Sequence, residues 1–393
     1  MNRNYDEIYS NVFTETELSE IRRDFHRHPE CDRDLFRTQA KICEYLDSWG
    51  ISYRKTDCCG VIADIKGNRP GKNIGLRADM DALHVVEQNT FDYVSQTPGV
   101  MHACGHDIHM TVLLGAAKAL ASLKGDFGGL VRLIFQPAEE ESGGAEPMIE
   151  EGCMDNPRLD HMFGLHVHPD YPPGMIGIKN DTACASINTF SITVRGKSAH
   201  AAMPEKGIDP IMITSHMIVA AQSVISRNTS PHDSSLVTFG KITGGLTANQ
   251  IPDSVTVEGT VRTLTPAVRK KTMESLKRVC RGVVTGLGGE IDFVDYGGYA
   301  PLINDNPTAD KVRAIAAEVI GKENVILKKE PQMYGEDFAY YGQIVPSVFY
   351  HLGCKPAEGE CGTLHNSSFA PSEDCIPVGV RLQLAIALEM AEN

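Results

Sequence analysis

The chain is short of basic residues and has no long apolar segment. Its 393 residues include 37 Lys and Arg against 51 Asp and Glu, a formal net charge of −14. Nucleic acids and anionic membrane surfaces both require a basic footprint, so we expect neither as a partner. No run of about 18 apolar residues occurs, which is the length that spans a bilayer. The composition therefore argues against a membrane-spanning or nucleic-acid-binding protein.

Features of an export signal and of a disulfide framework are also missing. The start, MNRNYDEIYSN, has neither a basic region nor an apolar core. The eleven cysteines are odd in number, irregularly spaced and without any CxxC pair. In a chain of this size, such usage is typical of reduced thiols that mostly fill the core. We therefore expect a cytoplasmic protein.

Two kinds of secondary-structure pattern divide the chain. Short apolar strands alternate with helical segments over residues 1–183 and again over 298–393, which indicates an α/β architecture with a mostly parallel sheet. Residues 184–297 follow the order β-α-β-β-α-β of the ferredoxin-like arrangement. A length of 393 residues also suggests about two domains. The sequence thus predicts a domain formed by 1–183 and 298–393, with an α+β domain, 184–297, inserted into it.

The segment MHACGHDIHM, residues 101–110, concentrates possible metal ligands. Cys104 and His106 are two residues apart, and in an extended or loop segment such side chains project to the same side. Thiolate and imidazole are the ligands that borderline-soft divalent metals prefer. No second pair closes the site locally, so further ligands must come from distant positions, for which His166 and His365 are candidates. We expect most of the other histidines, among them His26 and His28, to be structural or surface residues.

Acidic residues follow two of the predicted strands. Asp79 and Asp81 lie at or just beyond the C-terminal end of the strand at 74–78, the edge where ligand sites cluster in open α/β sheets. Glu139 and Glu140 follow the strand at 130–135, and adjacent side chains of an extended chain point to opposite sides. One could bind a metal while the other acts as a base on an adjacent water. Taken alone, the Glu-Glu pair is more typical of a solvated loop.

Seven motifs occur in one order, from residue 76 to residue 369: LRADMDAL, MHACGHDIHM, FQPAEE, GLHVHP, GKSAHAAMP, GGLTANQIPDSV and LHNSSF. Together they resemble the family of binuclear-metal aminoacylases and amidohydrolases, which includes hippurate hydrolases, N-acetyldiaminopimelate deacetylases and hydrolases of auxin–amino acid conjugates. The resemblance covers nearly the whole chain. It implies that a metal-activated water cleaves the amide bond of a small N-acyl amino acid, such as an N-acetyl or N-benzoyl conjugate.

The resemblance also implies a role for each site residue. Glu139 would be the general base. Asp79 or Asp81 would orient a metal ligand without binding the metal itself. His200 and Asn249, in the inserted lid domain, would stabilise the oxyanion and hold the amino-acid portion. In related enzymes this His reaches the active site of the partner protomer, so a homodimer formed through the inserted domain is implied. Two divalent ions, each Zn²⁺, Mn²⁺, Co²⁺ or Ni²⁺, would be held by five side chains, with the thiolate bridging: Cys104, His106, Glu140, His166 and His365.

Several alternatives stay open at this point. Arg262 could bind a substrate carboxylate or could form a surface ion pair with Glu258. The same scaffold could serve a dipeptidase or carboxypeptidase. A cysteine hydrolase with Cys104 as nucleophile and His106 as base, or a non-catalytic metal-binding protein, are rivals from other classes.

The sequence departs from the family pattern at three places. Tyr334 and Gly335 precede Glu-Asp-Phe where Gly-Ser is usual, His84 replaces the Pro after DAL, and Ala370-Pro371 replace acidic residues. None of these changes touches a proposed ligand. Acyl-group preference is the property they put most in doubt.

Overall fold

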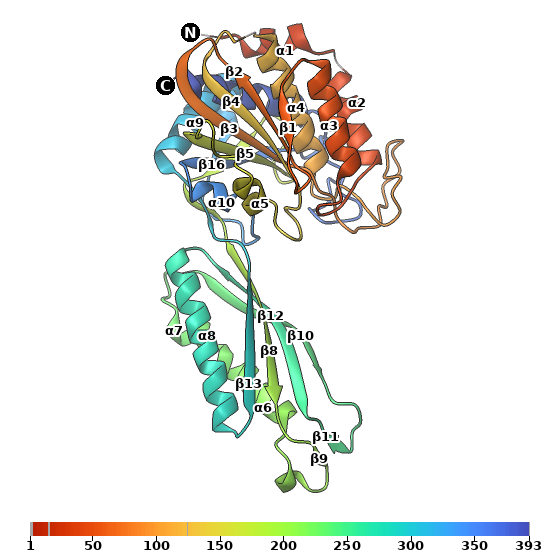
Figure 1. Ribbon diagram of the computed structural model, residues 1–393, viewed down its shortest axis with the longest axis vertical. Helices are drawn as coiled ribbons and strands as arrows, with labels where there is room; N and C mark the ends of the chain where they lie inside the picture. The colour runs from red at the N-terminus through yellow and green to blue at the C-terminus, as the bar shows by residue number, and fades with distance from the viewer. Residues whose placement is uncertain (1–2, 15, 124, 393) are drawn as a thin grey trace. The chain divides into compact units, whose positions relative to one another are not determined.

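The computed structural model describes residues 3–14, 16–123 and 125–392. This part of the chain divides into two compact units (Figure 1). Unit 1 comprises residues 1–183, 303–330 and 340–393, and unit 2 comprises residues 184–302 and 331–339. Among the described residues, no helix is both long and apolar enough to cross a membrane. Short strands β7 (Asp181–Cys184) and β14 (Leu302–Asn304) lie where the chain passes between the units.

Unit 1 is built on an eight-stranded sheet whose centre is parallel. Strands β4, β3, β5 and β16 pair in that order and run parallel, while β1, β2 and β6 pair with their neighbours towards the centre in antiparallel fashion. The predicted α/β class with a mostly parallel sheet is confirmed. In sheet order the strands are β1 (Tyr53–Lys55), β2 (Val61–Lys66), β4 (Gly128–Gln136), β3 (Arg69–Asp79), β5 (His161–His168), β16 (Ser347–Gly353), β6 (Ile176–Lys179) and β15 (Val325–Lys328).

Two long helices of unit 1 are almost entirely buried. α4 (His106–Ser122) and α11 (Cys375–Glu392) pack against each other and against β3. Because helices that are apolar on every side need partners on every side, the other helices surround them or cover the sheet. These are α1 (Tyr5–Val12), α2 (Glu17–Arg27), α3 (Phe36–Ser48), α5 (Ala145–Glu150), α9 (Asn306–Ile320), α10 (Ala339–Gly342) and the short 3₁₀ turn η2 (Lys322–Asn324).

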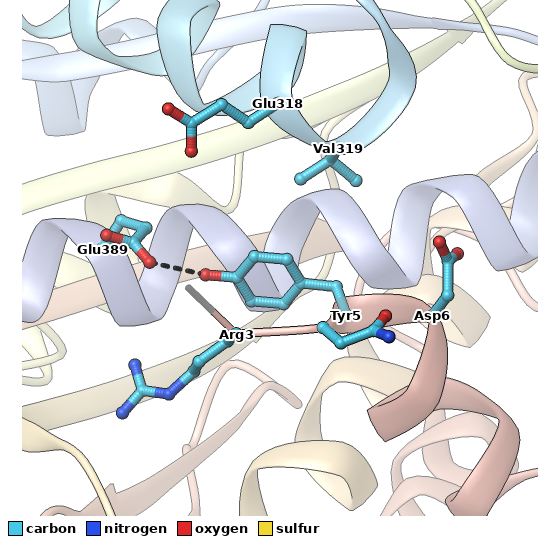
Figure 2. A pocket seen from close by; sticks show the side chains of 7 residues that line it. Arg3, Tyr5, Asp6, Glu318, Val319 and Glu389 are labelled. Carbon is cyan, nitrogen blue, oxygen red and sulfur yellow. Dashed lines mark hydrogen bonds between the residues drawn. The ribbon is translucent and has the colours of Figure 1, made fainter. Parts of the chain in front are cut away.

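The two ends of the described chain meet on unit 1. The Tyr5 hydroxyl, at the start of α1, donates a 2.7 Å hydrogen bond to Glu389 near the end of α11 (Figure 2). Arg3 binds the Glu392 carboxylate at 2.9 Å. Burial and the bond to Glu389 raise the pKa of Tyr5, so its hydroxyl stays a donor. These contacts fix the N-terminal helix on the C-terminal one.

Unit 2 has the predicted ferredoxin-like arrangement. Its four strands pair entirely antiparallel in the order β10-β12-β8-β13. On β8 the apolar residues Phe190, Ile192 and Val194 alternate with polar ones and are fully buried. α6 and α8 pack on the same strands and complete a separate core. The elements are β8 (Ser186–Arg195), η1 (Pro204–Lys206), α6 (Pro210–Ala221), α7 (Ser223–Asn228), β10 (Ser235–Gly244), β12 (Ser254–Thr263), α8 (Pro266–Gly286) and β13 (Glu290–Gly297).

Candidate metal centre

The residue between Cys104 and His106 is a glycine, and a side chain at this position would clash with a neighbouring residue. Gly105 has φ +88° and is the N-cap of α4, and a Cβ there would lie 2.4 Å from Cγ2 of Val167. Glycine is the residue that adopts this conformation without steric cost. His106 is the first residue of α4, whereas the interpretation of the spacing assumes an extended or loop segment. The tight turn nevertheless directs both side chains to one region.

Asp81 fixes the turn that carries the two adjacent glutamates. Its two carboxylate oxygens accept hydrogen bonds from the backbone N–H groups of Glu139 and Glu140, both at 3.0 Å. Its backbone carbonyl accepts a 2.7 Å bond from Nδ1 of His106. Ala138 has φ +58°, so the chain turns before Glu139 and is not extended there, contrary to the expectation from the strand pattern. A single aspartate thus holds the glutamate turn against the start of α4.

The five side chains expected to ligate metal converge in unit 1. The Cys104 Sγ lies 3.2 Å from His166 Nε2, and His365 Nε2 lies 3.2 Å from Glu140 Oε1. The same Glu140 oxygen is 3.8 Å from His106 Nε2. The side chains form two groups of three that share Cys104, and within each group the ligand atoms lie within 4.8 Å of one another. The groups are Cys104–His106–His166 and Cys104–Glu140–His365. Residues up to 261 positions apart in the sequence are therefore brought to one place.

The free atoms of these side chains suit cations. His106 Nδ1 donates to the Asp81 carbonyl and His166 Nδ1 donates to the Val167 carbonyl, each at 2.7 Å, so in the neutral imidazole each Nε2 carries the lone pair. His106 Nε2 is buried and makes no hydrogen bond among the described residues, and the buried Glu140 Oε1 faces His365 Nε2 at 3.2 Å. A buried polar atom without a partner costs about 1–3 kcal/mol. The donor set of sulfur, nitrogen and oxygen fits divalent transition metals, so the residues present fit the metal that the resemblance implies.

The electrostatic potential of the cluster also favours a bound cation. Burial, then the Glu140 and Glu139 carboxylates, raise the pKa of the Cys104 thiol well above its usual value. Burial lowers the pKa of His106, but Asp79 and Asp81 outweigh it and raise that pKa to about 10. Carboxylates therefore dominate the potential here. A nearby divalent ion reverses this balance and deprotonates a coordinating thiol.

Sequence reasoning missed one partner of the predicted Asp79. His109, one turn after His106 on α4, places Nδ1 2.5 Å from Asp79 Oδ1, and its Nε2 accepts the Val167 N–H at 2.9 Å. Arg77, on the same side of β3 as Asp79, binds its other oxygen at 2.6 Å. All three groups are fully buried. The i, i+3 spacing of the two histidines was a signal, because such residues share a helix face.

Unit 2 brings two of its three predicted site residues together. His200 on β9 (Ala199–His200) pairs with Gln250 on β11 (Gln250–Ile251), and the Asn249 carbonyl accepts the Ala201 N–H at 3.0 Å. β12 starts at Ser254, three residues after the end of β11, the strand that pairs with His200. Arg262 lies eight residues further along β12, about 26 Å from Ser254 at 3.3 Å per residue. One copy of unit 2 therefore does not present Arg262 beside His200.

The predicted alternative for Arg262 is not found either. Glu258 forms its ion pair with Lys241, at 2.8 Å, and Arg262 instead donates to Val261 O at 3.3 Å and to the Thr260 hydroxyl. Burial lowers the pKa of Arg262. The guanidinium is half-buried on β12 without a carboxylate partner among the described residues. A surface ion pair with Glu258 is therefore excluded in this structure.

A set of metal-ligating side chains from distant segments, beside one further buried carboxylate, is the arrangement of a metal-dependent hydrolase. The family model for Peptidase family M20/M25/M40 matches residues 75–389, and the chain belongs to this family. The predicted family and enzyme class, a hydrolase of amide bonds, are thereby confirmed.

Individual relatives agree with this assignment. The chain is 40% identical to an N-acetyl-L-cysteine deacetylase of Bacillus subtilis over 86% of this chain and 80% of that protein. It is 33% identical to a thermostable carboxypeptidase of Saccharolobus solfataricus over 96% of each chain. A solved dinuclear metal-binding peptidase of the M20 family from Bacillus subtilis superposes with a TM-score of 0.83 at 31% identity, over 98% of this chain and 99% of that one.

Proposed function

We propose that this protein hydrolyses the amide bond of N-acyl amino acids at a two-metal centre formed by Cys104, His106, Glu140, His166 and His365. The observation that carries the proposal is the convergence of these donors, with His106 Nε2 buried and without a hydrogen bond among the described residues. When bound, two divalent ions polarise the amide carbonyl and lower the pKa of a water molecule. The similarity to a dinuclear metal-binding peptidase supports a count of two.

Glu139 supplies the proton transfers in this proposal. It is 7% exposed, and its backbone is held by Asp81, so its carboxylate is fixed beside the ligand set. A carboxylate in that position takes a proton from the attacking water and delivers it to the leaving amine. Asp81 then acts as the positioning residue for both Glu139 and Glu140. Asp79 supports a different ligand, His166, through His109 and the Val167 peptide.

Similarity to an N-acetyl-L-cysteine deacetylase supports an N-acyl amino acid as the substrate class, whereas similarity to a carboxypeptidase keeps the peptide alternative open. A panel of N-acetyl, N-benzoyl and N-succinyl amino acids and of short peptides, assayed with Zn²⁺, Mn²⁺, Co²⁺ and Ni²⁺, separates them. We expect turnover of an N-acyl amino acid to exceed that of any peptide. Faster cleavage of peptides would overturn the proposal, and the same panel would identify the preferred metal.

The cysteine-hydrolase alternative finds little support. A nucleophilic cysteine needs a lowered pKa and an adjacent base. Burial and two carboxylates instead raise the pKa of Cys104, and the imidazole at its Sγ is His166 and not the expected His106. The absence of disulfides among the eleven cysteines supports the inference of a cytoplasmic location.

His200 and Asn249 are proposed to serve the reaction from unit 2. We expect His200→Ala to keep its metal content and to lose about 10²–10³-fold in kcat, because one donor to the oxyanion is removed. The control is His232→Ala, which removes another exposed histidine of unit 2. Steady-state kinetics and elemental analysis measure both quantities. Loss of metal from the His200 variant would contradict this role.

We further propose that the protein is a homodimer formed through unit 2. The outward face of α6 carries Ile211, Met212 and Val219, which are 45, 43 and 73% exposed, and β10 is an unpaired sheet edge. Exposed apolar faces and open edges are typical of interfaces. A dimer would also allow His200 of one subunit and Arg262 of the other to serve the same substrate, which a single unit 2 does not.

Val219→Asp tests the dimer at little cost to folding, because the side chain is 73% exposed. We expect this variant to sediment as a monomer at a concentration where the unmodified protein is dimeric, since a charge would be buried in the interface. Leu287→Asp, at the opposite edge of the sheet, should remain dimeric. Sedimentation velocity decides: a dimeric Val219→Asp protein would remove α6 from the interface.

A further inference from the structure

His26, expected to be an ordinary structural histidine, is buried between two carboxylates. Its Nδ1 lies 2.8 Å from Asp107 Oδ2 and its Nε2 lies 3.1 Å from Glu87 Oε1. A neutral imidazole donates through one nitrogen only, and ionised carboxylates only accept. Both contacts are satisfied together when His26 is an imidazolium. The side chain is completely buried, so water does not replace either partner.

The network around His26 is charge-balanced and extensive. Arg22, one turn earlier on α2, places Nε 2.7 Å from the same Asp107 oxygen, so two cations face Asp107 and Glu87. Glu87 also accepts the Ser95 N–H at 2.7 Å and the Asn89 side-chain amide at 2.9 Å. Buried charges are stable when they are paired and fully hydrogen-bonded. Removing the imidazolium would leave two buried carboxylates with one cation.

The network joins two segments that carry proposed metal ligands. Asp107 directly follows His106 at the start of α4. Glu87 lies in the loop of residues 84–100, here called the 84–100 loop. This loop binds the segment around His365: Gln88 N–H donates to Ser367 O at 2.8 Å, and the Asn89 side chain donates to Phe369 O at 3.1 Å.

The His365 segment needs such support. His365 has φ +62°, a left-handed conformation that is costly for a residue with a side chain, and it persists only when neighbouring groups impose it. Its N–H donates to the Ala103 carbonyl at 2.9 Å, beside Cys104. The side chain itself is about half exposed, so packing alone does not hold it. The two hydrogen bonds from the 84–100 loop add to this constraint.

We propose that His26 is a positioning residue whose doubly hydrogen-bonded imidazolium ties the 84–100 loop to the start of α4 and thereby holds His365 in register with Cys104 and His106. The inference rests on the ligand set proposed above. It predicts that the ligand set is assembled before metal binds. The ion-paired group of His26, Asp107 and Glu87, here called the brace, contains no ligand side chain. Among the described residues, the His26 side chain forms no hydrogen bond or ion pair with a proposed metal ligand.

The test is His26→Gln, studied without metal and then with it. Glutamine keeps hydrogen-bonding capacity but not the charge, so we expect faster hydrogen–deuterium exchange in residues 86–97 and 363–369 of the metal-free protein. Metal titration should show about 10–100-fold weaker binding, typical for loss of a group that supports ligands. Excess metal should restore kcat, which a general loss of folding would not allow.

Two further variants keep this test decisive. His28→Gln is the matched control, since His28 lies two residues away, is 34% exposed and contacts only Asp24 among the described residues. It should behave as the unmodified protein. Glu87→Gln removes the other charge and should reproduce the exchange pattern even if His26→Gln folds poorly. Unchanged exchange and metal affinity in both brace variants would overturn the inference.

A pH profile separates the brace from ordinary packing. The groups facing His26 are Arg22, Asp107, Glu87, His102 and Tyr93, and the Phe91 ring lies edge-on to the imidazole with 5.6 Å between centroids. Burial and Arg22 lower the pKa of His26, but its bonds to Asp107 and Glu87 outweigh them, so the pKa is raised. A raised pKa means that the brace is intact at low pH and is lost as pH rises through the folded-state value.

We therefore expect loop protection, corrected for intrinsic exchange, to fall in a step with rising pH, and we expect this step to be absent in His26→Gln. A step that persists in the variant would assign the pH dependence to another group and contradict the brace. None of these readouts requires a substrate. Failure of the proposed amide hydrolysis with an intact exchange result would therefore overturn the function alone, not the brace.

Discussion

A Glu139→Gln variant is expected to keep both metal ions and to lose about 10²–10⁴-fold in kcat, the range that a positioned general base contributes. Glutamine has the same shape and can keep the Glu139 backbone bond to Asp81, which is made by the main chain. It has no basic oxygen, so neither proton transfer is possible. The metal ligands are untouched, and KM should change much less than kcat.

The run of glutamates supplies the control for this experiment. Glu141 follows directly, has a side chain that is 44% exposed and lies 3.7 Å from His84. Glu141→Gln should retain the activity of the unmodified protein. Metal content by elemental analysis and kcat per bound metal are measured on both variants. If Glu139→Gln lost metal but kept its turnover per metal ion, Glu139 and Glu140 would have to exchange roles.

The two-domain architecture could be predicted because its signals are local. Alternation of buried and exposed residues on β8, and Asp209-Pro210 at the start of α6, act within a few residues. Helix boundaries near the site were less predictable. α4 begins at His106, because Gly105 starts the helix from a left-handed conformation. Nothing in apolar periodicity reports that conformation.

The convergence of the ligands could not be deduced from spacing, because Cys104 and His365 lie 261 positions apart and meet only through the sheet order. It could be expected only from the resemblance. The surrounding charges were not anticipated at all. Whether an imidazole such as that of His26 meets carboxylates 61 and 81 residues away depends on tertiary packing. Histidines that look alike in sequence therefore have very different environments.

Glu140→Ala is expected to abolish turnover by a different route, through loss of metal. Glu140 Oε1 is buried and lies 3.2 Å from His365 Nε2. Removing the carboxylate deprives His365 of its anionic neighbour and the site of its only oxygen ligand among the five proposed. We expect metal affinity to fall by more than the about 10–100-fold that supporting groups typically contribute.

Comparison of the two glutamate variants is what makes this result informative. Calorimetric titration of the metal-free proteins should give two binding events for Glu139→Gln and at most one strong event for Glu140→Ala, although the side chains are adjacent in sequence. High metal concentration should restore part of the activity of Glu140→Ala, because Glu139 is intact, but none of that of Glu139→Gln. Two tight sites in Glu140→Ala would remove this residue from the ligand set. The centre would then have to be completed by another carboxylate, for which Asp79, grouped with His106 and His109, is one candidate in unit 1.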